Sequence, residues 1–302
     1  EKALKIFKEV LPENHPDLAR SYNSLGNAYC NKGDYNGAIE QYEKALKICE
    51  EVLLENHPNF AMSYNNLGVA YADKDDNDKA IEQYEKALKI FKEVLPENHP
   101  DLARSYNNLG VAYRNKGDND KAIEYCEKAL KIYEEVLPEN HPNLASLYNN
   151  LGNAYRNKGD YNGAIEYCEK ALKIREEVLP ENHPDLARSY NNLGNAYADK
   201  GDYNGAIKQY KKALKIREEV LPENHPNLAI SYNNLGAAYA DKGDNDKAIE
   251  QYEKALAIFK IALPNNHPYI ALIYKNIIET FQDMEDYENA QKYLDEMENF
   301  CK

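Results

Sequence analysis

The sequence predicts an all-α protein, a solenoid of antiparallel helix pairs, and three observations carry this prediction. All seven histidines lie 42 residues apart, from His15 to His267, and each is followed directly by proline. All 13 prolines occupy only two positions of this repeat, as expected of helix boundaries. Between the boundaries, apolar residues recur at spacings of three and four, as on the buried face of a helix. A repeat of this length cannot bury its own apolar face, so neighbouring repeats must stack.

The repeat divides the chain into three parts of a single predicted domain, residues 1–302. Residues 1–14 align with the second half of a repeat, and we expect them to form the second helix of a truncated repeat. Residues 15–266 hold six complete repeats, and residues 267–302 form a divergent capping repeat at the C-terminus. Because the chain starts in mid-repeat and without methionine, we expect it to be a piece of a longer protein.

Each complete repeat predicts two helices, which we call A and B. In the first repeat, helix A covers about residues 16–32 and helix B about residues 35–53. Gly33 lies between them, where glycine suits the left-handed residue that ends a helix, and Asp34 can cap helix B. The expected buried stripe of helix A is Leu18, Tyr22, Leu25, Gly26 and Tyr29, and that of helix B is Ala38, Ile39, Tyr42, Ala45, Leu46 and Cys49.

Two repeats depart from this pattern. In the second repeat, Asp75 replaces the turn glycine and Leu54 replaces the linker proline. A left-handed aspartate costs about 1 kcal/mol, so we expect local fraying around residues 70–80. In the last repeat, Ile278 stands where the other A helices have glycine and Glu285 replaces the turn glycine, which is typical of a terminal cap.

These residues carry a family resemblance. Tyr22-x2-Leu25-Gly26-x2-Tyr29, followed by Ala38-x3-Tyr42-x2-Ala45, resembles the tetratricopeptide repeat signature, with tyrosine at the usual tryptophan and phenylalanine positions. Equivalent matches run through nearly the whole chain, and the 42-residue length is most similar to the repeats of kinesin light chains. The resemblance implies a right-handed superhelix whose A helices line a concave groove, and this groove binds peptide segments of partner proteins.

Composition and charge exclude several kinds of partner. A formal charge of −14 argues against nucleic acid, because phosphate binding requires a basic surface. No apolar run approaches the length of about 18 residues that a membrane span needs, so we expect no membrane partner. Five cysteines without a disulfide pattern suit a reducing compartment, and we expect a cytoplasmic location.

The recurring histidines are not expected to bind metal. Equivalent residues of stacked repeats are separated by helix packings of roughly 8–10 Å each, whereas the ligands of one zinc ion lie about 2.1 Å from it. A role at the start of helix A, as for His15 beside Pro16, fits better. An active site appears once in a chain, but every notable polar residue here recurs, so we expect no catalytic residues, no cofactor and no metal.

The expected groove surface of helix A is rich in asparagine. An amide offers two donors and an acceptor, so a row of asparagines can pair with the backbone of an extended peptide. The other interpretation is that these amides satisfy neighbouring turns or bind water. The candidate asparagines are Asn23, Asn27, Asn65, Asn66, Asn107, Asn108, Asn149, Asn150, Asn153, Asn191, Asn192, Asn195, Asn233 and Asn234.

Five of the seven arginines fall on the same expected surface. Arg20, Arg104 and Arg188 lie near the start of helix A, and Arg114 and Arg156 lie near its end. Our hypothesis is that the arginines of the middle repeats favour a partner segment that carries carboxylates. The alternative is that they balance nearby aspartates and glutamates of the chain itself.

The sequence therefore predicts a non-enzymatic scaffold that binds peptide segments of partner proteins, with acidic segments as the favoured class. Two alternatives stay open. One is a self-assembling array, joined end to end through the exposed apolar face of residues 1–11. The other is a sensor or regulatory module of a larger signalling protein, as in proteins that these repeats resemble.

Overall fold

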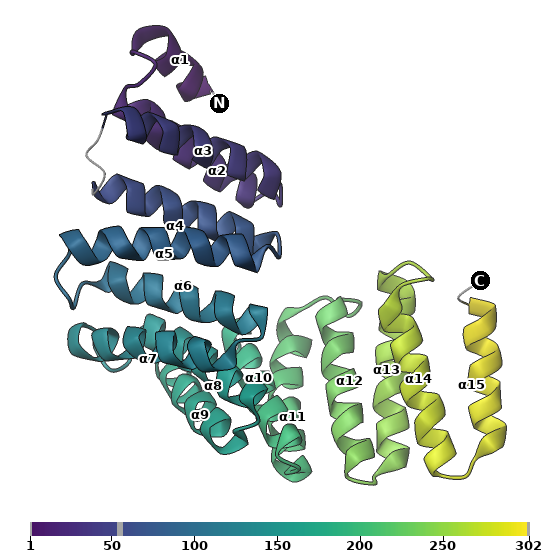
Figure 1. Cartoon of the computed structure of the whole chain (residues 1–302). Coiled ribbons are helices and arrows are strands. Elements are labelled where there is room, and N and C mark those ends of the chain that lie inside the picture. The colour runs from purple at the N-terminus through teal and green to yellow at the C-terminus, as the bar shows by residue number, and fades with distance from the viewer. Residues whose placement is uncertain (1, 53–56, 301–302) are drawn as a thin grey trace. The chain divides into compact units, whose positions relative to one another are not determined.

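The computed structural model describes residues 2–52 and 57–300, and within these ranges the chain forms α-helices joined by short turns (Figure 1). The A helices are α2 (Pro16–Cys30), α4 (Pro58–Asp73), α6 (Pro100–Lys116), α8 (Pro142–Lys158), α10 (Pro184–Asp199), α12 (Pro226–Asp241) and α14 (Pro268–Asp283). The B helices are α1 (Lys2–Val10), α3 (Tyr35–Val52), α5 (Asn77–Val94), α7 (Asn119–Val136), α9 (Tyr161–Val178), α11 (Tyr203–Val220), α13 (Asn245–Ala262) and α15 (Tyr287–Phe300).

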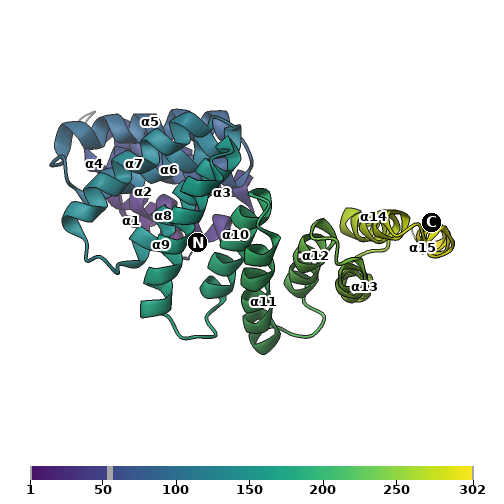
Figure 2. The same cartoon turned by 90° about the horizontal axis from the view of Figure 1, so that it is seen from below.

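The chain divides into two compact units, residues 1–158 and residues 159–302. In the first unit α2 packs with α3, α4 with α5, and α6 with α7, and each B helix also packs on the A helix that follows it. The second unit repeats this pattern from α9 to α15 (Figure 2). The predicted fold class, an all-α solenoid of helix pairs, is confirmed within each unit, and the single domain over residues 1–302 stays a prediction.

The regular 42-residue spacing of the histidines has a structural cause at the start of each A helix. Every one of the seven caps its helix, because its Nδ1 accepts a hydrogen bond from the backbone N–H two residues later. At His99 this bond, from the N–H of Asp101, is 3.1 Å long, and the backbone is extended with φ −71° and ψ 133°. Pro100 then occupies the first helical position, where a missing N–H costs nothing. The predicted boundary role of the histidines is confirmed.

The turns between A and B helices show why glycine recurs there. Gly117 has φ +91°, a left-handed conformation, and the side chain of Asp118 accepts a hydrogen bond from the N–H of Lys121 to cap α7. Asp75 and Glu285 adopt the same conformation without being glycine, with φ 63° and 58°. The left-handed aspartate predicted in the second repeat is confirmed, whereas Leu54 lies outside the described residues.

Replacing Asp75 by glycine is expected to raise the free energy of unfolding by about 1 kcal/mol, because glycine takes positive φ without the clash of a Cβ. Urea unfolding measures this gain, and hydrogen exchange of residues 70–80 should slow at the same time. The matched control is Gly117→Ala at the equivalent turn, which should lose a similar amount. A less stable Asp75→Gly variant would show that the aspartate side chain stabilises this turn.

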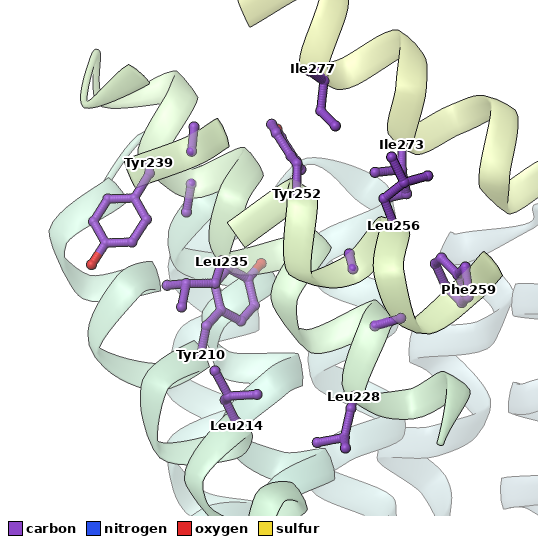
Figure 3. Packing of buried hydrophobic residues seen from close by; sticks show 14 of the residues in the cluster. Tyr210, Leu214, Leu228, Leu235, Tyr239, Tyr252, Leu256, Phe259, Ile273 and Ile277 are labelled. Carbon is purple, nitrogen blue, oxygen red and sulfur yellow. The ribbon is translucent and has the colours of Figure 1, made fainter. Parts of the chain in front are cut away.

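The core of the second unit lies between consecutive helix pairs. Figure 3 shows Tyr252, Leu256 and Phe259 of α13 beside Ile273 and Ile277 of α14. All five are at most 5% exposed. The last A helix thus covers the apolar face of α13, and α15 covers part of α14 with Tyr293, Met297 and Phe300. The capping role of residues 267–302 stays a prediction.

Helices A and B of one repeat approach closely at the glycine of the signature. A Cβ built on Gly194 of α10 would lie 2.6 Å from the Tyr210 ring of α11, which is closer than real Cβ contacts. Gly236 and Tyr252 form the equivalent contact one repeat later, at 2.8 Å. The glycine is therefore needed for packing and not for its backbone conformation.

Candidate interaction surface of the A helices

A hollow of about 460 Å³ lies between the A helices α2 and α4 of the first unit. Four of the predicted groove residues, Arg20, Asn23, Asn27 and Asn66, line it. Cys49 of the B helix α3 also contributes to its wall, so the hollow reaches down between the two A helices. The remaining lining residues are Ala19, Ser24, Asn59 and Met62.

Most of the predicted asparagines join one A helix to the next. The amide of Asn108 on α6 donates to the side-chain oxygen of Asn65 on α4, at 2.9 Å. The same bond recurs one repeat apart, from Asn150 to Asn107 at 2.9 Å, from Asn234 to Asn191 at 3.1 Å and from Asn276 to Asn233 at 2.9 Å. Asn149 of α8 and Asn192 of α10 occupy the same two positions. Each bonded amide thus uses one donor or one acceptor inside the scaffold, and Asn65 is buried in this arrangement.

The third asparagine position is tied to helix B. Asn27 accepts a hydrogen bond from the hydroxyl of Tyr42 at 2.6 Å, and Asn195 accepts one from Tyr210 at 2.7 Å. Burial raises the pKa of Tyr42 well above its usual range, so this hydroxyl stays a donor at neutral pH. Asn153 occupies the same position on α8.

Three of the predicted arginines form ion pairs within their own helix. Arg104 lies 2.9 Å from Asp101, Arg188 lies 3.0 Å from Asp185, and Arg20 lies 3.4 Å from Asp17. These pairs are exposed, with 49–75% of each arginine side chain accessible, so each contributes little to stability. A ligand carboxylate would compete with these aspartates for the guanidinium groups.

Arg114 has a packing role that its position in the sequence does not suggest. Its guanidinium donates to Asn115 at 3.1 Å, and burial lowers its pKa. Cys126, whose thiol is kept neutral because burial raises its pKa, stands where other repeats have a tyrosine such as Tyr84. The two changes compensate in volume, because the tyrosine repeats carry a small residue, such as Ala72, at the arginine position. Arg156 and Cys168 show the same exchange in the sequence.

Arg175 and Arg217 were not among the predicted groove residues, but they occupy the position of Cys49 on the B helices α9 and α11. Nη1 of Arg217 donates to the hydroxyl of Ser231 and, at 3.4 Å, to the backbone carbonyl of Asn227, both on α12. Arg175, only 5% exposed, likewise donates to Ser189 on α10. Burial lowers the pKa of both arginines. Every other complete repeat has phenylalanine, tyrosine or cysteine at this position. The change to arginine in two repeats is the sequence signal that could have identified Arg175 and Arg217.

The described residues contain no group of three or more histidine, cysteine, aspartate or glutamate side chains that could hold a metal ion. None of the helices in the described ranges is both long and apolar enough to cross a bilayer. What the A-helix surface offers chemically is amide donors and acceptors with guanidinium groups among them, which suits polar recognition.

Stacked helix pairs with an open row of A helices define a class of protein, the α-helical repeat scaffold. The tetratricopeptide repeat profile matches residues 1–51, 17–93, 59–135, 101–177, 143–219 and 190–261. The chain therefore belongs to the tetratricopeptide repeat family, whose fold is generally a non-enzymatic protein-interaction fold. A search of curated protein sequences finds no match.

Several solved structures are similar to this chain. The nearly identical TPR-like repeats of a protein from Podosopora anserina assigned as a kinesin light chain are 27% identical, cover 68% of this chain and 97% of their own, and give a TM-score of 0.60. BtubC from P. vanneervenii is 28% identical over 68% of this chain and 81% of its own, with a TM-score of 0.60. The apo form of RapI, 18% identical over 94% of this chain and 76% of its own, shares the fold with a TM-score of 0.73. The predicted resemblance to kinesin-light-chain-like repeats is confirmed.

Proposed function

We propose that this protein is a non-enzymatic scaffold that binds an extended, acidic peptide segment of a partner protein along its A helices. The hollow between α2 and α4 supports the proposed location of the binding site, because predicted groove residues line it. The asparagine rows support the proposed binding mode, since side-chain amides on different A helices can pair with different backbone groups of an extended peptide.

The environment of Arg217 is the observation on which the proposed preference for acidic segments rests. Within the described residues its guanidinium bonds only to a hydroxyl and a backbone carbonyl, and no carboxylate lies within 4.0 Å of it. A half-buried charge without a counter-ion is costly, and a carboxylate from a ligand would supply one. We assign Arg217 a larger role than Arg104 and Arg188, because those two already have aspartate partners.

Replacing Arg217 by phenylalanine is expected to weaken binding of acidic peptides by about tenfold or more, since a charge-assisted hydrogen bond contributes about 1.5–3 kcal/mol. Peptides selected from a random library on the full chain provide the probes, and fluorescence anisotropy measures their affinities. The variant should fold, because Phe91 and Phe259 occupy this position in other repeats. Ser231 keeps a bond from its hydroxyl to the carbonyl of Asn227.

A combined Arg104→Ala and Arg188→Ala variant tests the outer arginines separately. We expect a smaller loss from it than from Arg217→Phe, because the aspartate partners already compete for these side chains. Acidic peptides that bind both variants as tightly as the wild type would rule out a carboxylate-selective groove. End-to-end assembly and a sensor role in a larger protein stay predictions from the sequence.

A further inference from the structure

Helix α11 differs in charge from the B helices of the other complete repeats. Two positions that hold glutamate elsewhere are Lys208 and Lys211 in α11. With Lys212 and Lys215 they give four lysines spaced i, i+3, i+4 and i+7, which lie on one face of a helix. We call these four residues the lysine stripe. The replaced glutamates correspond to Glu40, Glu43, Glu82, Glu85, Glu124, Glu127, Glu166, Glu169, Glu250 and Glu253.

In the other repeats these glutamates have structural partners. The first of each pair binds the lysine four residues later, as Glu124 binds Lys128 at 2.6 Å. In α5, α7 and α9 the second accepts a hydrogen bond from a tyrosine of the next A helix, as Glu127 does from Tyr155 at 3.0 Å. Glu253 of α13 accepts one from Tyr293 on α15. Helix α11 has neither interaction, and its lysines repel one another at i, i+4 spacing. A gain in the stability of the fold therefore does not explain why lysine replaces glutamate at positions 208 and 211.

The lysine stripe is open to solvent and has no ionic partner. All four side chains are exposed, and no carboxylate of the described residues lies within 4.0 Å of their ammonium groups. Lys211 lies over the ring of Tyr239 at 5.6 Å and Lys212 over that of Tyr190 at 4.7 Å, which holds both near the helix surface. The lysine stripe is thus a local patch of positive charge on a chain whose net charge is −14.

A hollow of about 410 Å³ adjoins one side of the stripe. Lys212 and Lys215 line it together with apolar groups from α10, α11 and the preceding linker, and with three glutamates. The apolar residues are Leu179, Leu186, Tyr190 and Ile216, and the glutamates are Glu176, Glu181 and Glu219. The surface therefore offers cations beside a place for one apolar side chain.

We infer that the lysine stripe forms a docking surface for an acidic helix of a partner protein, independent of the A-helix groove. The adjoining hollow, which has three glutamates against two lysines, would take an apolar side chain of that helix and none of its carboxylates. A helix with carboxylates at i, i+3, i+4 and i+7 repeats the spacing of the lysines along about 10 Å. The stripe is one helix wide, and the B helices on either side carry Glu166 and Glu250 at the equivalent position. A membrane or a nucleic acid duplex needs a broader positive surface than this.

The Lys208→Glu/Lys211→Glu variant tests this docking surface. It restores the glutamates of the other repeats, so it should fold at least as stably as the wild type. The probe is a fluorescein-labelled synthetic helix with glutamates at the four spacings, and a helix with glutamine there is its control. We expect the variant to bind the acidic helix about tenfold more weakly, with the wild-type affinity falling as salt is raised.

The matched control is Lys89→Glu/Lys131→Glu, which changes the net charge equally on the exposed faces of α5 and α7. It should bind the acidic helix as the wild type does. The inference is overturned if both double variants lose affinity equally, if neither does, or if the glutamine helix binds as well. Tighter binding of anionic vesicles or of duplex DNA through the same lysines would also overturn it.

Discussion

Replacing Tyr274 by alanine is expected to lower the free energy of unfolding by about 3–5 kcal/mol, which is the cost of truncating a large aromatic residue in a core. Tyr274 is fully buried, with 0% of its surface exposed, and it lies on α14 among Ile270, Ile273 and Ile277. Its loss opens a cavity at the helix that covers α13. Urea unfolding of the full chain, followed by circular dichroism, measures the change.

Two further variants separate the parts of this effect. Tyr274→Phe removes the hydroxyl, which donates to Glu296 at 3.0 Å and also contacts the ammonium group of Lys260, and it should cost about 0.5–1.5 kcal/mol. Tyr269→Ala changes a residue of the same helix that is 46% exposed, and it should cost less than about 1 kcal/mol. If Tyr274→Ala costs no more than Tyr269→Ala, then α14 does not act as the cap of the second unit.

Replacing Gly194 by valine is the second large change, with an expected loss of about 3 kcal/mol. Even a Cβ at this position would lie 2.6 Å from Cε1 of Tyr210, and valine adds two more carbons. The ring cannot simply rotate away, because its hydroxyl bonds to Asn195 and its side chain is only 5% exposed. Urea unfolding again gives the free energy.

The matched control is Gly201→Ala in the turn that follows α10. Nothing lies within 4 Å of a Cβ there, but its φ of +84° strains any residue with a side chain, so we expect a loss of about 1 kcal/mol. Equal losses of unfolding free energy for the two variants would mean that Tyr210 can move away from a side chain at position 194 without an energetic penalty. The close contact between Gly194 and Tyr210 would then not limit stability.

The sequence was enough to predict the helix pairs, their boundaries and the left-handed turn at Asp75, because these depend on signals that are local and repeat every 42 residues. A proline after His99 or a glycine at 117 acts on the backbone within a few residues. Local signals of this kind do not depend on which side chain lies opposite, so the sequence of one repeat predicts the helices of all six.

The roles of single polar residues could not be predicted in the same way. That Asn108 bonds to Asn65, 43 residues earlier, depends on how two A helices are offset against each other. That Arg217 reaches Ser231 depends on the packing of α11 against the next repeat. The position of Arg114 on helix A predicts a place in the groove, whereas its burial follows from the small Cys126 on helix B.

The bond between asparagines 43 residues apart also bears on how such a chain can change during evolution. The A helices α4, α6, α8, α10 and α12 each carry an asparagine at the acceptor position and one at the donor position, so a repeat with both asparagines suits a neighbour of the same kind. A gene duplication or deletion of one 42-residue unit among these five repeats would preserve the pairing of donor and acceptor asparagines. The length of the scaffold can therefore grow or shrink in whole repeats, while Arg217 and the lysine stripe mark the single repeat whose loss would remove a specific surface.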